Sequence, residues 1–154
     1  MEHFNLVIAV ELSSRLEYAF LALIELADNY KTQNPVKISE IAERHSLPER
    51  YLEQILSALR REGIIQSMRG AKGGYVLVRE PWKMTLQEAI AIVEGEEKSR
   101  EIEGYDGSNV EKSVIYEIWG QANQASQGIF KRYTIQDLCE KRDTYRQGST
   151  MYYI

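Results

Sequence analysis

The segment from Ser46 to Gly63 constrains the fold of this chain most. Its apolar residues recur at intervals of three and four and predict one buried stripe of a helix: Tyr51, Leu52, Ile55, Leu56 and Leu59. Ser46 and Glu49 have the spacing of an N-terminal capping box, Pro48 is tolerated in a first helical turn, and Gly63 suits the C-terminal end. The opposite face is polar and can contact DNA bases or phosphates through Arg50, Glu53, Gln54, Ser57, Arg60 and Arg61.

A shorter helix is predicted just before this segment. Ser39 is its expected N-cap, Ile41 and Ala42 are its inward residues, and His45 and Ser46 make the turn that follows. A short helix, a tight turn and an amphipathic helix with an outward polar face are typical of a helix-turn-helix.

A basic hairpin is predicted directly after the two helices. Its strands are Ile64–Met68 and Tyr75–Val78, and the connection between them holds three glycines together with Arg69 and Lys72. The glycine-rich loop could instead cradle a nucleotide phosphate, but it lacks the Walker spacing and does not open a helix. A helix pair alone is weak evidence, whereas a helix pair followed by a basic wing favours DNA binding. We expect DNA contacts from Arg50, Tyr51, Glu53, Gln54, Ser57, Arg60, Arg69, Gly70, Lys72, Gly73 and Gly74.

The distribution of charge agrees with this interpretation, although the formal net charge is −4. The segment from Arg44 to Arg79 holds seven Lys and Arg against three Glu, a local balance of +4 that leaves −8 on the rest of the chain. Segregated charge of this kind focuses a positive potential on one face.

Two motifs in this region resemble those of a known family. Leu52-Glu53-Gln54 in the second helix and Arg69-Gly70-Ala71-Lys72-Gly73-Gly74-Tyr75 in the hairpin are similar to the signature of the Rrf2 family of bacterial winged-helix regulators. The resemblance continues in Leu16–Ala27 and Thr85–Gly95. It implies a mainly α fold with a small β-hairpin wing and a long dimerisation helix. It also implies a cytoplasmic repressor that binds a palindromic DNA operator as a homodimer.

Four regions are expected along the chain: an N-terminal extension (1–13), the winged helix-turn-helix domain (14–95), an acidic loop (96–109) and a dimerisation helix with a C-terminal tail (110–154). The domain should open with a helix over Ser14–Tyr30 and close with a helix that Thr85 and Glu88 cap. Met1–Ala9 precedes the point where family members usually begin. It is either an extra partner-binding segment or the product of an upstream start codon.

A second long helix is predicted over Val110–Arg132. Its apolar residues form a two-heptad seam, and the expected dimerisation residues are Ile115, Ile118, Trp119, Ala122, Ala125 and Ile129. Such a helix could also simply cover the core, but a palindrome reader needs a two-fold axis. A short last helix is expected from Thr134 to Lys141.

The sequence offers little for catalysis or cofactor binding. Cluster-binding members of the resembled family carry three cysteines in the region of the acidic loop, whereas this chain has Cys139 alone, so we expect no cysteine-ligated iron–sulfur cluster. Cys139 is read as a buried apolar residue, with a redox sensor as the alternative. His3 and His45 are too scattered for a metal site. We expect no enzyme activity. The alternative function is a protein-interaction module, or a co-regulator that acts through a partner of the cysteine-synthase type.

The C-terminal residues Met151-Tyr152-Tyr153-Ile154 are unusually apolar for a tail. They resemble the tail of the family member that controls cysteine metabolism together with O-acetylserine sulfhydrylase. The resemblance implies that this enzyme could bind the tail through the Ile154 carboxylate. The alternative is a tail that packs on its own dimer. No apolar run approaches the roughly 18 residues of a membrane span, so we expect no membrane partner.

Overall fold

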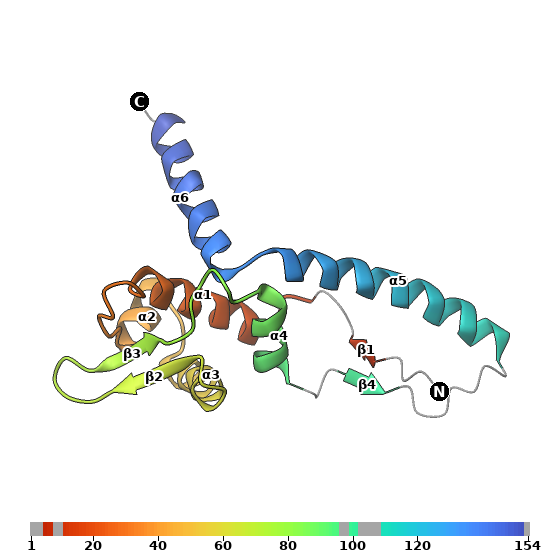
Figure 1. The fold of residues 1–154 in the computed structure, drawn as a ribbon, viewed down its shortest axis with the longest axis horizontal. Helices are drawn as coiled ribbons and strands as arrows, with labels where there is room; N and C mark the ends of the chain where they lie inside the picture. The colour runs from red at the N-terminus through yellow and green to blue at the C-terminus, as the bar shows by residue number, and fades with distance from the viewer. Residues whose placement is uncertain (1–4, 8–10, 96–98, 102–108, 153–154) are drawn as a thin grey trace.

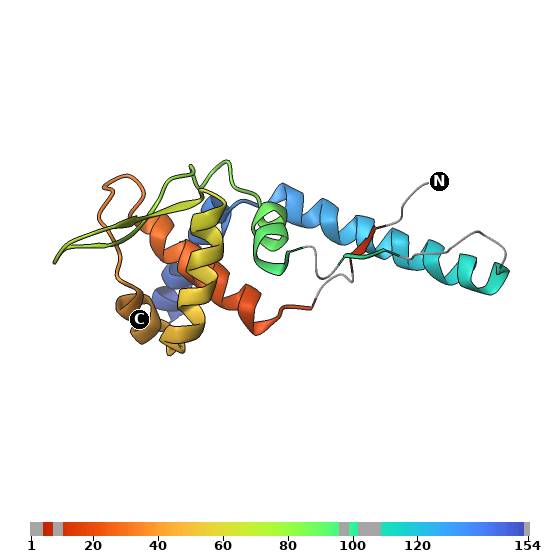
Figure 2. The same ribbon diagram turned by 90° about the horizontal axis from the view of Figure 1, so that it is seen from below.

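A computed structural model of the chain describes residues 5–7, 11–95, 99–101 and 109–152, with side chains described for 11–95 and 109–148. A helical body carries a hairpin at one end, and a long helix extends away from the opposite end (Figures 1 and 2). The elements of the body are α1 (Ser14–Asp28), α2 (Ile38–His45), α3 (Glu49–Arg61), β2 (Ile65–Met68), β3 (Gly74–Leu77) and α4 (Leu86–Glu94). The remaining elements are β1 (Asn5–Val7), β4 (Ser99–Glu101), α5 (Val110–Arg132) and α6 (Ile135–Tyr152).

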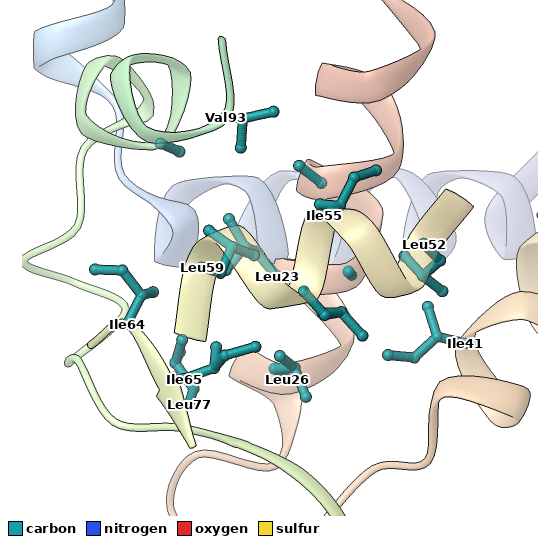
Figure 3. Packing of buried hydrophobic residues seen from close by; sticks show 14 of the residues in the cluster. Leu23, Leu26, Ile41, Leu52, Ile55, Leu59, Ile64, Ile65, Leu77 and Val93 are labelled. Carbon is teal, nitrogen blue, oxygen red and sulfur yellow. The ribbon is translucent and has the colours of Figure 1, made fainter. Parts of the chain in front are cut away.

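The hydrophobic core lies between α1 and α3 (Figure 3). Leu23 and Leu26 of α1 face the predicted stripe of α3, of which Leu52, Ile55, Leu56 and Leu59 are fully buried. The fifth stripe residue, Tyr51, is half-buried and packs edge-to-face on Tyr18 with ring centroids 5.6 Å apart. Burying each leucine or isoleucine contributes about 1.5–3 kcal/mol. This stripe therefore fixes which face of α3 remains outside.

The turn between α2 and α3 differs from its predicted capping. Ser46 adopts the left-handed conformation (φ 54°, ψ 47°) and ends α2, and the next amide, that of Leu47, bonds the Ala42 carbonyl at 2.8 Å. Pro48 then precedes α3 without a side-chain cap, so the predicted capping box of Ser46 and Glu49 is wrong. The chain reverses direction at Ser46, so Ser46 cannot also cap α3, which begins at Glu49.

Other helix boundaries also differ from expectation. Ser39 lies inside α2, whose N-cap is Lys37 without a side-chain bond. Helix α1 ends at Asp28, before the predicted end at Tyr30, and its N-cap is Ser13, whose Oγ accepts from the Leu16 amide at 3.1 Å. At the end of α3, Gly63 takes φ +75° directly after the C-cap residue, as predicted for a helix terminus.

The predicted hairpin is confirmed and is joined by a further backbone segment. Strands β2 and β3 pair antiparallel from Ile65↔Leu77 to Met68↔Gly74. Val36, in the loop before α2, bridges Tyr75 through two backbone hydrogen bonds of 2.9 and 2.8 Å. The start of β3, close to the hairpin loop, is thereby tied to the segment that leads into the helix-turn-helix.

Helix α4 begins with the predicted capping box. The Thr85 hydroxyl accepts from the Glu88 amide at 3.2 Å, and a Glu88 carboxylate oxygen accepts from the Thr85 amide at 3.3 Å. Three backbone hydrogen bonds join this region to the connection between α5 and α6: Leu86 N to Tyr133 O (2.9 Å), Ile135 N to Met84 O (2.9 Å) and Gln136 N to Pro81 O (3.1 Å). This elbow attaches both C-terminal helices to the body.

Helix α5 has the predicted bounds, but α6 is longer than expected. It continues past Lys141 to Tyr152, so the prediction of a short last helix is wrong. Arg142 donates to both carboxylate oxygens of Asp28 on α1, at 2.7 and 2.8 Å, which holds this part of α6 on the body. Met151 and Tyr152 are helical, while Tyr153 and Ile154 lie outside the described residues.

A short ribbon links the N-terminal extension to the segment predicted as an acidic loop. Strand β1 pairs antiparallel with β4, with Asn5 opposite Glu101 and Val7 opposite Ser99. The structure thus places a strand within residues 96–109, where only a loop was expected. In the described part of the chain, no helix is both long and apolar enough to cross a membrane.

Candidate nucleic-acid interface

The polar face of α3 is presented to solvent because its opposite face is locked in the core. Arg50, Glu53, Gln54 and Arg60 are exposed, and Ser57 is half-buried. Tyr51 lies at the margin of this face, where Tyr18 packs against its ring. The structure therefore brings the predicted α3 residues onto one side of one helix. Their contacts with DNA stay a prediction.

The cations of this region divide into paired and unpaired groups. Arg44 donates to the buried carboxylate of Glu25 at 2.7 Å, and Arg79 pairs with Glu88 at 2.9 Å. These two arginines stabilise the scaffold. Among the residues that the structure describes, no ion pair involves Arg50, Arg60, Arg61, Arg69 or Lys72. These five cations lie on α3 and the hairpin, where Glu49, Glu53 and Glu62 offset part of their charge.

The predicted hairpin residues have two different roles. Arg69, Gly70 and Lys72 are exposed at the tip, where they can reach a ligand. Gly73 is buried, and a Cβ there would collide with the Met68 carbonyl oxygen. Gly74 has φ +152°, and a Cβ there would lie 2.6 Å from the Val36 carbonyl carbon and oxygen. Gly73 and Gly74 therefore shape the hairpin and its attachment to the body.

A hollow lies between the end of α3 and strand β2. It is lined by Arg60, Gly63, Ile65, Gln66, Ser67 and Arg69. Gln66 and Ser67 were not predicted as site residues, although both are exposed polar residues on the strand next to the helix end. They lie near Arg60 because β2 packs against the end of α3, and this packing could not be predicted from the spacing of the residues in the sequence.

The predicted dimerisation residues lie on an uncovered side of α5. Ile115, Ile118, Trp119 and Ile129 are 53, 57, 55 and 45% exposed, and Ala122 and Ala125 are also exposed. The alternative that α5 simply covers the core does not account for this side, because a core-covering helix would bury its large apolar residues. Exposed apolar stripes of this kind are typical of interaction surfaces, and the dimer role of this one stays a prediction.

Cys139 lies inside the body against α1. Its side chain is 5% exposed, and its Sγ lies 4.0 Å from the Ile24 carbonyl oxygen, to which it donates. Burial raises the pKa of the Cys139 thiol to about 11, with Asp28 adding to the effect. Such a thiol is inert at neutral pH, which fits the buried apolar role better than a sensor. Among the described residues, no three His, Cys, Asp or Glu side chains gather as a metal site.

Comparison with known proteins gives a consistent picture. The family model Rrf2, described as an iron-dependent transcriptional regulator, matches residues 12–141. The HTH-type transcriptional regulator CymR of Bacillus subtilis is 32% identical over 145 residues, which cover 94% of this chain and 100% of CymR. The HTH-type transcriptional regulator IscR of Klebsiella pneumoniae is 28% identical over 135 residues, covering 87% of this chain and 82% of IscR.

Two solved structures have a similar fold. The structure of CymR (YrzC), the global cysteine regulator of B. subtilis, has a TM-score of 0.73 at 31% identity and covers 86% of this chain and 98% of that one. The structure of T. potens IscR has a TM-score of 0.69 at 31% identity, with 88% and 90% covered.

Proposed function

The chain belongs to the Rrf2 family of transcriptional regulators, which are not enzymes, and from this we propose that it is a cytoplasmic repressor that binds a palindromic operator as a homodimer. The observation that carries the proposal is the cluster of cations on α3 and the wing that form no ion pair with the described residues, next to an exposed polar face that the core holds outward. In this proposal α3 is the recognition helix and the hairpin is the wing.

Specificity is assigned to Glu53 and Gln54. Both are exposed on α3, and their neighbours Leu52 and Ile55 are fully buried, so the helix cannot rotate to withdraw them. A Gln side chain can bond adenine through two hydrogen bonds, and a Glu can accept from cytosine in the major groove.

Fluorescence anisotropy with operator duplexes changed one base at a time tests this assignment. Gln54→Ala should relax the preference at one position in each half-site, by about 1–3 kcal/mol. If Gln54→Ala instead lowers the affinity for every operator duplex equally, Gln54 only positions the helix.

The wing should contribute affinity that depends on salt. Arg69→Ala should lower the slope of log K against log salt by about one if Arg69 neutralises a phosphate. Lys141→Ala provides a control, because it removes one exposed positive charge on α6, where Lys141 lies over the Tyr133 ring. If the Arg69 variant behaves like this control in affinity and in slope, the wing does not contact DNA.

We assign the dimer interface to the exposed apolar side of α5. Ala122→Glu and Ala125→Glu place a carboxylate in the seam, where burial without a partner is costly. Both should give monomers in analytical ultracentrifugation and greatly weaken DNA binding. Gln124→Glu is the matched control, because Gln124 is exposed on a different side of the same helix. Seam variants that remain dimeric would place the interface elsewhere.

A second proposal concerns O-acetylserine sulfhydrylase as a partner of the Ile154 tail. It rests on the tail resemblance and on the course of α6, whose C-terminal half projects away from the body (Figure 1). Deleting residues 151–154 should abolish binding to the sulfhydrylase and leave melting temperature and DNA affinity unchanged. A fall in stability of a few kcal/mol would instead show that the tail packs on the protein itself.

A further inference from the structure

The hollow between α3 and β2 has a composition suited to one kind of ligand. Arg60 in the last turn of α3 and Arg69 just after β2 both line it, together with the polar residues Gln66 and Ser67 of β2. No carboxylate is among its lining residues. Two like charges that share a space repel each other, so an anion between them is favoured.

The helix end beside the hollow does not oppose an anion as strongly as a bare C-terminus would. Carbonyl groups at the C-terminal end of a helix are partly negative and repel anions. Here the Leu59 carbonyl accepts from the Ile64 amide at 3.0 Å, and the Arg60 carbonyl accepts from the Gly63 amide at 3.0 Å. Gly63 makes this closure possible through its positive φ of +75°.

The lining side chains match the oxygens of a phosphate. Guanidinium groups bind phosphate oxygens through paired N–H donors, and a Ser hydroxyl or a Gln amide can add a further donor. Because successive side chains of a strand point to opposite faces, β2 presents one of these two donors to the hollow. Because the hollow opens between the recognition helix and the wing, a phosphate bound there would touch both elements at once.

We infer that this hollow binds a single phosphate group of the DNA backbone, clamped between Arg60 and Arg69, with β2 supplying one further donor from Gln66 or Ser67. The inference rests on the proposed function and deepens it. One phosphate shared by α3 and the wing fixes the position of the recognition helix along the groove. It adds Gln66 and Ser67 to the residues predicted from sequence.

A salt titration of DNA binding tests whether the two arginines share one phosphate. Each neutralised phosphate adds about 0.9 to the slope of log K against log salt. The Arg60→Ala/Arg69→Ala double variant should therefore lose about 0.9, whereas two separate phosphates would give a loss of about 1.8. The double variant should also bind more tightly than the product of the two single effects predicts.

The matched control pairs Arg60→Ala with Arg50→Ala. Arg50 lies in the first turn of the same helix, too far from Arg60 to share a phosphate, so these two effects should multiply. All variants should melt like the wild type, because the substituted side chains are exposed. Independent effects of Arg60 and Arg69, with a slope loss near 1.8, would overturn the inference while leaving the proposed function intact.

Two further measurements distinguish a DNA phosphate from a free one. Operator duplexes with one methylphosphonate at a time should show a position in each half-site that weakens the wild type and leaves the double variant unaffected. Inorganic phosphate, added at constant ionic strength against chloride, should leave the melting temperature unchanged. If free phosphate raises the melting temperature and no methylphosphonate position affects the wild type selectively, the hollow binds a small anion and the inference is overturned. A wild type that binds no palindromic duplex would overturn both proposals.

Discussion

Gly74→Ala probes the attachment of the wing to the body. Gly74 has φ +152°, a conformation that L-residues avoid, and strain of this kind costs about 1–3 kcal/mol. The added Cβ would lie 2.6 Å from the Val36 carbonyl, which is backbone and cannot swing aside. Relief requires the bridge between Val36 and Tyr75 to open, with the loss of two hydrogen bonds worth about 0.5–1.5 kcal/mol each. The total expected destabilisation is about 2–6 kcal/mol.

Urea and thermal unfolding measure this loss directly. For a chain of this size, about 1 kcal/mol lowers the melting temperature by roughly 2–4 °C, so Gly74→Ala should lower it by on the order of 10 °C. Gly70→Ala is the matched control in the same hairpin, because Gly70 also has positive φ (+109°) but no atom within 4 Å of an added Cβ. Gly70→Ala should lose only the roughly 1–3 kcal/mol that the strained backbone conformation costs. Equal losses in the two variants would refute the close approach of Gly74 to Val36.

Further predictions concern the body and its only thiol. Thr85→Ala should destabilise the protein by about 1 kcal/mol through loss of the capping hydrogen bond, as read from urea midpoints. A double-mutant cycle of Asp28→Ala and Arg142→Ala should give a coupling of about 1 kcal/mol, because the pair is bidentate but partly exposed. Burial raises the pKa of the Cys139 thiol from 9.0 to about 11, so the folded protein favours the neutral thiol. The free energy of unfolding should therefore be independent of this group below pH 9 and should fall as the pH rises from 9 towards 11. Alkylation of Cys139 at pH 8 should therefore require local unfolding, and rapid modification of the native protein would contradict its burial. Anaerobically purified protein should be colourless and bind DNA without iron, and a stoichiometric cluster absorption band would refute this expectation.

The periodic parts of the fold could be predicted from sequence because local patterns determine them. The stripe of α3 and the capping box at Thr85 and Glu88 depend on residues a few positions apart, and both are confirmed. The bounds of α5 followed from its apolar repeat in the same way. The predicted capping by Ser46 failed because its spacing was right but the reversal of the chain required the left-handed conformation at that residue.

The tertiary features that sequence missed depend on contacts between distant residues. The Val36–Tyr75 bridge and the pairing of Asn5 with Glu101 join segments that carry no strong strand pattern of their own. The length of α6 has the same cause, since Arg142 lies beyond the predicted end and is held by Asp28 of α1. In the candidate site, Gln66 and Ser67 were missed because only the packing of β2 against the end of α3 brings them to Arg60.

The elbow formed by Met84, Leu86, Tyr133, Ile135 and Gln136 with Pro81 makes α5 a lever arm. The helix has 23 residues and is therefore about 35 Å long. A tilt of about 5° around its far end displaces the elbow by about 3 Å, close to the spacing of roughly 3.4 Å between successive nucleotides of one strand. Because backbone hydrogen bonds fasten the body to the elbow, the recognition helix would follow this displacement. In the proposed dimer, a small change in how two α5 helices cross would thus alter the distance between the two α3 helices by about one base-pair step, with no change in any side chain proposed to face the bases.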